Sequence, residues 1–132
     1  MKKLICVICL CMIALLTVQK FNGLSADEKG KHVLRHVVLF TFKADAKPEQ
    51  VQKIVDAFGE LPSKIDTIQD YEWGVNNSPE KHDKGHTHCF LVTFKSEADR
   101  DAYLPHEAHQ AFVKELLPIL EDVTVVDYWA SK

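Results

Sequence analysis

The chain has 132 residues, of which 46% are hydrophobic and 27% are charged, and its formal net charge is −3. A chain of this length and composition is expected to fold as one small globular domain. Its acidic balance and the lack of a cluster of basic residues argue against nucleic acid or an anionic membrane surface as a partner.

The first 26 residues have the pattern of a secretory signal. Lys2 and Lys3 precede an uncharged apolar run at residues 4–18, and a more polar stretch with small residues at its end follows. The apolar run is shorter than the roughly 20 residues that span a bilayer. We therefore expect residues 1–26 to be a signal peptide, cleaved after Ser25 or Ala26, with export to the periplasm or the extracellular space. An uncleaved membrane anchor is the alternative; after cleavage we expect no stable membrane association.

Cleavage would change the charge and the cysteine content. Without Lys2, Lys3 and Lys20, 13 of the 16 basic residues remain against 19 acidic ones, which gives a net charge of −6. Three of the four cysteines leave with the signal, so Cys89 would be alone and no internal disulfide could form. The remaining domain must therefore be stabilised by packing.

The first half of the domain predicts a strand, a helix and a second strand. Residues 35–42 are β-branched and aromatic, as is typical of strands, and they are apolar on both faces. A helix is predicted to begin at Pro48, which suits a first helical position, and to end before Pro62. Residues 71–75 alternate between apolar and polar, which predicts a half-buried strand, and a polar loop at 76–85 follows.

The second half predicts a strand, an interrupted helix and a last strand. Residues 86–94 form the third predicted strand. Ser96 with Asp99 resembles a capping box and predicts a helix start, and Pro105 is expected to interrupt that helix. Residues 123–129 form the fourth predicted strand. The second helical segment has an apolar stripe of Ala108, Phe112, Val113 and Leu116.

The element order is therefore β-α-β-β-α-β. This order predicts an α+β, ferredoxin-like domain over residues 33–130, with two helices on one face of an antiparallel sheet. The other sheet face would also be apolar, and exposing it would be costly at roughly 25 cal/mol per Å². We therefore expect a second copy to cover this face, which makes the protein a homodimer.

A set of ring side chains predicts a pocket. The stretch DAYLPHEAHQAF places Tyr103, His106 and His109 on both sides of the helix break, and His36 and His88 occupy apolar strand positions. If the strand faces that carry His36 and His88 meet the helices, these side chains would converge. A histidine in an apolar pocket has its charged form disfavoured and can serve as a general base, while a tyrosine hydroxyl can hold a carbonyl oxygen. The alternative is that each histidine is a core residue with satisfied hydrogen bonds.

Four stretches carry a resemblance to a known family. They are RHVVLFTFK, the WG of Trp73 and Gly74, THCFLVTFKSEADRDAYLPHEAHQAF and VVDY. The chain resembles the stress-responsive α/β-barrel (Dabb) domain family over nearly all of the mature chain. The resemblance implies a dimeric α+β barrel, in agreement with the element order.

The resemblance also implies roles for the pocket residues. Its enzymatic relatives are similar to olivetolic acid cyclase, in which a histidine base and a tyrosine act in an intramolecular aldol condensation. His109 matches the base, Tyr103 the tyrosine, and His36 and His88 the pocket histidines; His106 is expected to contact the ligand. One departure is Glu107, which stands where the family often has proline.

Three interpretations of function remain open. The first is an exported homodimer that binds a small, largely apolar ligand in a His/Tyr pocket, as a cyclase- or lyase-like general-base enzyme without a cofactor. The second is a non-catalytic stress-response or scaffold protein with structural histidines. The third is a metal-binding protein that uses His82, His86 and His88, of which the last two are expected to share a strand face; their spacing matches no structural zinc pattern.

Overall fold

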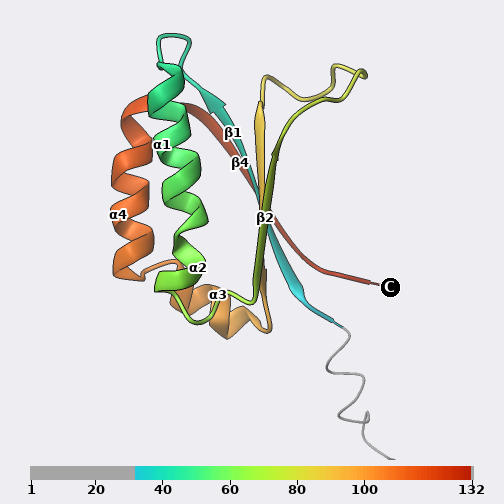
Figure 1. The fold of residues 1–132 in the computed structure, drawn as a ribbon. Helices are drawn as coiled ribbons and strands as arrows, with labels where there is room; N and C mark the ends of the chain where they lie inside the picture. Colours follow the sequence, from blue (N-terminus) through green and yellow to red (C-terminus); the bar gives the residue numbers. More distant parts are fainter. Residues whose placement is uncertain (1–31, 132) are drawn as a thin grey trace, which may run out of the picture.

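The computed structural model describes residues 32–131, so the predicted signal peptide at 1–26 lies outside the described residues. The domain consists of one four-stranded sheet with its helices on one side (Figure 1). In chain order the elements are β1 (Leu34–Phe42), α1 (Pro48–Gly59), α2 (Leu61–Lys64), β2 (Asp70–Val75), β3 (His88–Phe94), α3 (Glu97–Tyr103), α4 (Glu107–Leu116), a 3₁₀ turn (Leu117–Ile119) and β4 (Leu120–Trp129).

The strand order in the sheet is β2-β3-β1-β4, and every neighbouring pair is antiparallel. This topology confirms the predicted ferredoxin-like β-α-β-β-α-β arrangement. Figure 1 shows α1 and α4 side by side against one face of the sheet, with α2 and α3 at one end. None of the helices within residues 32–131 is long and apolar enough to cross a bilayer.

The start of α1 follows from its sequence, and α1 ends before Pro62 as predicted, although Pro62 is not the residue that ends helical structure here. Pro48 occupies the first turn, and the backbone N–H of Lys47 donates to the side-chain oxygen of Gln50 at 2.9 Å. The helix ends at Gly59, but Pro62 lies in the first turn of α2 and does not stop the chain from turning helically again. A proline is tolerated there because the first N–H groups of a helix have no intrahelical acceptor.

The predicted helix break at Pro105 is confirmed, and the structure adds a cap. The hydroxyl of Ser96 accepts from the backbone N–H of Asp99 at 3.1 Å and begins α3. After Pro105, His106 is the N-cap of α4, because its Nδ1 accepts from the backbone N–H of Ala108 at 3.1 Å. Histidine is not among the residues usually found at this position, so the sequence did not indicate this role.

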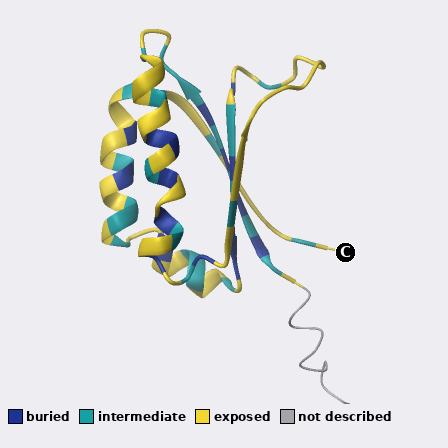
Figure 2. Cartoon of the chain, viewed as in Figure 1, coloured by how far each residue is buried: buried dark blue, intermediate teal, exposed yellow. Residues whose placement is uncertain are grey.

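The core lies between the helices and the sheet, and aromatic rings fill its centre. The ring of Phe58 on α1 is 4.6 Å from that of Phe90 on β3 and 4.7 Å from that of Phe112 on α4, measured between centroids. Figure 2 shows the buried residues on the sheet-facing sides of α1 and α4. Rings at these separations add stacking energy to the burial of apolar area, so this cluster stabilises the layer contact.

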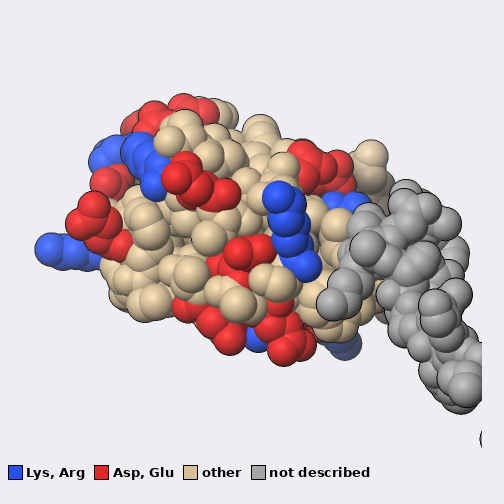
Figure 3. Space-filling view, turned by 90° about the horizontal axis from the view of Figure 1, so that it is seen from below, with Lys and Arg blue, Asp and Glu red and all other residues tan. Residues whose placement is uncertain are grey.

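The sheet face away from the helices is only partly covered. Val37 and Leu39 on this face are half-buried, whereas Val126 and Tyr128 on the edge strand β4 are 50% and 47% exposed. The end of the molecule seen in Figure 3 carries acidic and basic side chains interspersed. Most of the exposed large hydrophobic residues within residues 32–131 lie on strands β2 and β4; they are Trp73, Val75, Val123, Val125, Val126, Tyr128 and Trp129.

Candidate functional site

An apolar cavity of about 330 Å³ lies between α4 and the helix-facing side of β1 and β4. Apolar side chains from β1, α1, α4 and β4 form most of its wall. The polar side chains on the wall are those of His36, His109 and Asp127. A mostly apolar wall with a few polar groups is the usual composition of a small-molecule site.

His36 and Asp127 form a hydrogen-bonded pair on this wall. They are directly opposite each other in the β1–β4 register, and His36 Nδ1 lies 2.6 Å from Asp127 Oδ1. The two side chains are 7% and 27% exposed. The second carboxylate oxygen, Oδ2, accepts from Nη1 of Arg100 on α3 at 3.0 Å. Asp127 thus links a strand histidine to a helix arginine.

Tyr103 and His109 lie next to this pair. The Tyr103 ring is 1% exposed, and its centroid is 4.3 Å from that of His109 and 5.8 Å from that of His36. Burial raises the pKa of Tyr103 far above its ordinary value, so the hydroxyl keeps its proton and can donate a hydrogen bond.

His109 is held in one defined form. Its Nδ1 lies 2.9 Å from the carbonyl oxygen of Leu104, and because a carbonyl only accepts, Nδ1 carries the hydrogen and Nε2 is the acceptor of the neutral ring. Burial lowers the pKa of His109, and the nearby His36 and His106 lower it further, against the opposing effect of the hydrogen bond to Leu104. His109 is therefore a neutral ring with a basic nitrogen near pH 7, as a general base requires.

His88 lies apart from the other predicted site residues. It is four positions along β3 from Val92, the residue that pairs with His36, so about 13 Å of strand separates the two histidines. There its ring stacks on Trp73, with centroids 6.3 Å apart and an interplanar angle of 11°. The expectation that His88 shares a pocket with His36 and His109 is wrong. The two strand histidines lie on the same sheet face, but they are too far apart along the strands to line one pocket.

His106 also has a different place from the one expected. Its Nδ1 caps α4, and its side chain does not belong to the wall of the apolar cavity within residues 32–131. The structure therefore places His36 and His109 on the cavity wall and leaves out His88 and His106. Tyr103 is not on the wall, but its ring packs on both of these histidines.

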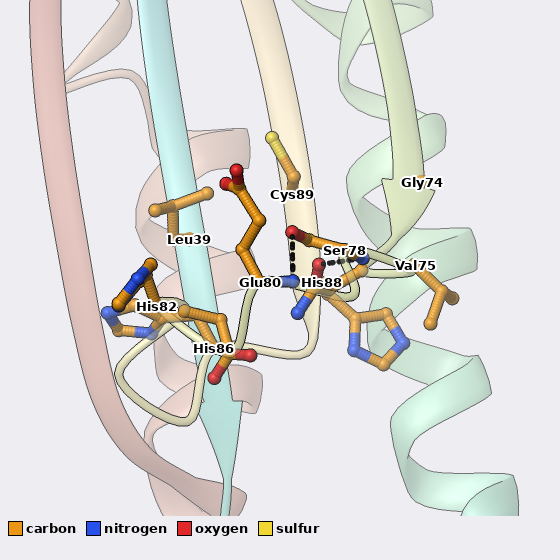
Figure 4. A pocket seen from close by; sticks show the side chains of 11 residues that line it. Leu39, Gly74, Val75, Ser78, Glu80, His82, His86, His88 and Cys89 are labelled. Carbon is orange, nitrogen blue, oxygen red and sulfur yellow. Dashed lines mark hydrogen bonds between the residues drawn. The ribbon is translucent and has the colours of Figure 1, made fainter.

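A second hollow, of about 420 Å³, lies between the loop that joins β2 to β3 and the sheet face away from the helices. Figure 4 shows Leu39 and Cys89 on the strands, with Glu80 and His82 reaching over from the loop. Within residues 32–131, no group of three or more histidine, cysteine, aspartate or glutamate side chains is placed to hold a metal ion.

His86, at the edge of this hollow, has a structural role. It is 7% exposed, and its two ring nitrogens are hydrogen-bonded to the hydroxyls of Thr41 at 3.0 Å and Thr124 at 2.9 Å. These threonines lie on the sheet face away from the helices, whereas His88 lies on the helix face with Phe90. The prediction that His86 and His88 share a strand face is wrong, because β3 begins only at His88 and the chain turns before it.

Two residues of the site were not identified from the sequence. Asp127 follows Val123 and Val125 at alternate positions of β4, and this alternation could have placed it on the helix face. Arg100 is three residues before Tyr103 on α3, on the same side of that helix. The contact of Asp127 with His36 depends on the sheet register, and the contact of Arg100 with Asp127 depends on how α3 docks.

The fold and the cavity define an α+β protein of ferredoxin-like topology with an apolar pocket beside α4. The chain belongs to the family described as the stress responsive A/B barrel domain, whose model matches residues 34–130. This match confirms the resemblance predicted from the sequence.

Relatives and solved structures agree with this membership. The stress-response A/B barrel domain-containing protein HS1 of Arabidopsis thaliana is 33% identical over 101 residues, which cover 76% of this chain and 93% of that protein. A hydroxynitrile lyase from Passiflora edulis superposes with a TM-score of 0.72 at 26% identity, over 77% of this chain and 96% of that one. A dimeric protein of unknown function with a ferredoxin-like fold from Bacteroides fragilis superposes with a TM-score of 0.59 at 29% identity, over 73% and 94%.

Proposed function

We propose that the protein binds a small, largely apolar ligand in the cavity between α4 and the β1–β4 edge, and that His109 and Tyr103 act on the polar group of that ligand. The observation that carries this proposal is the neutral His109, whose Nδ1 is held by Leu104 and whose ring packs on the buried Tyr103. The basic nitrogen and the phenol can then serve one polar group of the ligand while the apolar wall holds the remainder.

The chemistry that fits these groups is general-base catalysis. Nε2 of His109 would take a proton from a hydroxyl group or from a carbon next to a carbonyl, and the hydroxyl of Tyr103 would donate to the oxygen on which charge develops. A cyclase- or lyase-like reaction needs these two roles and no cofactor. The similarity to a hydroxynitrile lyase from Passiflora edulis supports this class of reaction.

A non-catalytic stress-response protein is the second candidate. It is favoured by the structural hydrogen bonds of two other histidines. Nδ1 of His86 bonds the hydroxyl of Thr41 and holds the loop before β3, and Nδ1 of His106 accepts from the backbone N–H of Ala108 at the start of α4. In that case His109 would be a packing residue as well, and its replacement would affect stability more than binding.

The two candidates are separated by comparing binding with stability. The probe for binding is benzaldehyde, a small aromatic carbonyl compound, followed by NMR shifts of the cavity residues; mandelonitrile cleavage to benzaldehyde and hydrogen cyanide, followed by absorbance, tests turnover. We expect His109→Ala and Tyr103→Phe to weaken binding or turnover about tenfold or more, as loss of a positioned catalytic group does. His106→Asn, which keeps an N-cap acceptor, is the matched control and should bind as the wild type does.

If His109→Ala lowers the melting temperature strongly while benzaldehyde binding is unchanged, the functional proposal fails and the structural candidate stands. If the wild type neither binds nor turns over these compounds, native mass spectrometry of the protein purified from its own host gives a second test. A co-purifying small molecule that is lost from His109→Ala would support the proposal. A ligand-free protein in that measurement would contradict it.

We also propose that the protein is a homodimer through the sheet face away from the helices. The exposed Val126 and Tyr128 support this, as does the similarity to a solved protein described as dimeric. Sedimentation at micromolar concentration should give twice the monomer mass, and Val126→Lys should shift the protein toward the monomer. A monodisperse wild-type monomer would contradict the proposal.

Export is proposed from the N-terminal pattern alone, the Lys2-Lys3 start followed by a short apolar run. The intact mass of the protein expressed in its own host should correspond to a chain that begins after Ser25 or Ala26. A soluble product that retains Met1 would rule out this proposal.

A further inference from the structure

Four side chains form a continuous polar chain from the surface to the cavity. Nε and Nη2 of Arg100 donate to Oδ1 of Asp101 at 3.0 and 2.9 Å, and Nη1 donates to Oδ2 of Asp127 at 3.0 Å. Oδ1 of Asp127 lies 2.6 Å from Nδ1 of His36. The guanidinium thus bonds the exposed Asp101 at the surface end and Asp127 at the inner end.

The carboxylate of Asp127 determines which nitrogen of His36 carries the hydrogen. An ionised carboxylate only accepts, so the 2.6 Å contact requires a hydrogen on Nδ1, and Nε2 is left as the acceptor of the neutral ring. The rings of Phe94 and Tyr103 meet His36 edge-on, at centroid distances of 6.2 and 5.8 Å, and they bring no charge to it. Among these neighbours, Asp127 is the charged group that selects the tautomer.

Asp127 is 27% exposed, so its carboxylate has an alternative to this contact. Without a partner on Oδ2 it could turn toward water, and the bond to His36 would then form only part of the time. The charged donor of Arg100 opposes this rotation, because a charge-assisted hydrogen bond is stronger than one between neutral groups. A planar guanidinium can bond two carboxylates in fixed directions, which an ammonium group cannot do.

We infer that Arg100 is a positioning residue: by holding the outer oxygen of Asp127, it fixes the inner oxygen on His36 and keeps that histidine in the Nδ1–H form, with Nε2 as its acceptor. The functional consequence of this inference rests on the proposed function. If the cavity binds a ligand, a fixed acceptor at Nε2 of His36 helps to bind and orient that ligand. His36 and Asp127 both lie on the cavity wall, whereas Arg100 acts on them from α3.

The test needs no ligand. Protein labelled with ¹⁵N in its histidine rings is compared by long-range ¹H–¹⁵N spectra at about pH 8, where a histidine of ordinary pKa is neutral. The wild type should show His36 almost wholly as Nδ1–H. In Arg100→Gln the ratio of Nδ1–H to Nε2–H is expected to fall by about threefold or more, because Asp127 then lacks its charged partner and bonds His36 only part of the time. Asp101→Asn is the matched control: it weakens the outer contact of Arg100, keeps the inner one, and should leave the ratio near that of the wild type.

Arg100→Lys gives a second test that keeps the charge. Its single ammonium group lacks the guanidinium fork, so the ratio is expected to lie between those of the wild type and Arg100→Gln. If Arg100→Gln does not fold, a lowered ratio in Arg100→Lys supports the inference and an unchanged one overturns it. A melting temperature lowered in Arg100→Gln with an unchanged tautomer ratio would also overturn it, and Arg100 would then only attach α3 to β4.

The outcome is independent of the test of function. A shifted tautomer ratio in a protein that binds no ligand would support the role of Arg100 and defeat the proposed function alone. Ligand binding in a protein whose His36 tautomer is insensitive to Arg100 would defeat the role of Arg100 alone.

Discussion

Replacing Asp127 by alanine should destabilise the domain through His36. The His36 side chain is 7% exposed, so the Nδ1–H that loses its acceptor cannot simply bond to water. A buried donor without a partner costs about 1–3 kcal/mol. For a domain of this size the loss corresponds to a melting temperature lower by about 5–15 °C. Arg100 is 21% exposed and can be hydrated again, so most of the loss should come from His36.

The assay is urea denaturation followed by tryptophan fluorescence, at one fixed protein concentration because dimerisation would stabilise the folded state. Asp127→Asn is the informative companion, since its amide oxygen can still accept from Nδ1, and its loss should be under about 1 kcal/mol. Asp101→Ala, at a side chain that is 64% exposed, should leave the midpoint nearly unchanged. If Asp127→Ala lies within about 0.5 kcal/mol of the wild type, His36 has another acceptor and the reasoning from its buried donor is refuted.

Three other predictions concern the core, the pH dependence and a helix cap. Phe58→Ala should lower the free energy of unfolding by about 3–5 kcal/mol, because the ring is 2% exposed and central to the aromatic cluster; a loss below about 1 kcal/mol in urea denaturation would contradict this. Burial lowers the pKa values of His109 and His88, so the unfolded chain binds more protons and stability should be lost as the pH falls below about 6.5, the ordinary histidine value. Melting temperatures that stay constant from pH 7.5 to pH 5, with no difference in His109→Gln, would be inconsistent with these lowered pKa values. Ser96→Ala should cost about 1 kcal/mol through the lost cap on Asp99 and Ser96→Asp should restore it, as measured by circular dichroism melts; equal stability of all three proteins would show that the cap is dispensable.

Local sequence determined the elements and several of their ends. Pro48 and Ser96 begin α1 and α3, and Pro105 separates α3 from α4, because caps and prolines act on backbone groups within one helical turn. The alternation along β1 likewise put His36 on one face with Val38 and Phe40, since successive strand residues point to opposite sides, but it did not say which face meets the helices. These features depend on neighbours a few residues apart, and a single sequence is sufficient to predict them.

The site itself was decided by tertiary structure. The sequence left open whether the strand faces that carry His36 and His88 meet the helices. Both faces do, but the separation of the two histidines along the strands depends on the β1–β3 register. The turn before β3 placed His86 on the opposite face, and His106 became a cap because the break at Pro105 left the first N–H groups of α4 without acceptors. The contact between His36 and Asp127 joins residues 91 positions apart, and it exists because the β1–β4 register puts them opposite each other. Hydrogen bonds over such separations depend on how strands pair and helices dock, so the local pattern could supply the histidines of this site but not their partners.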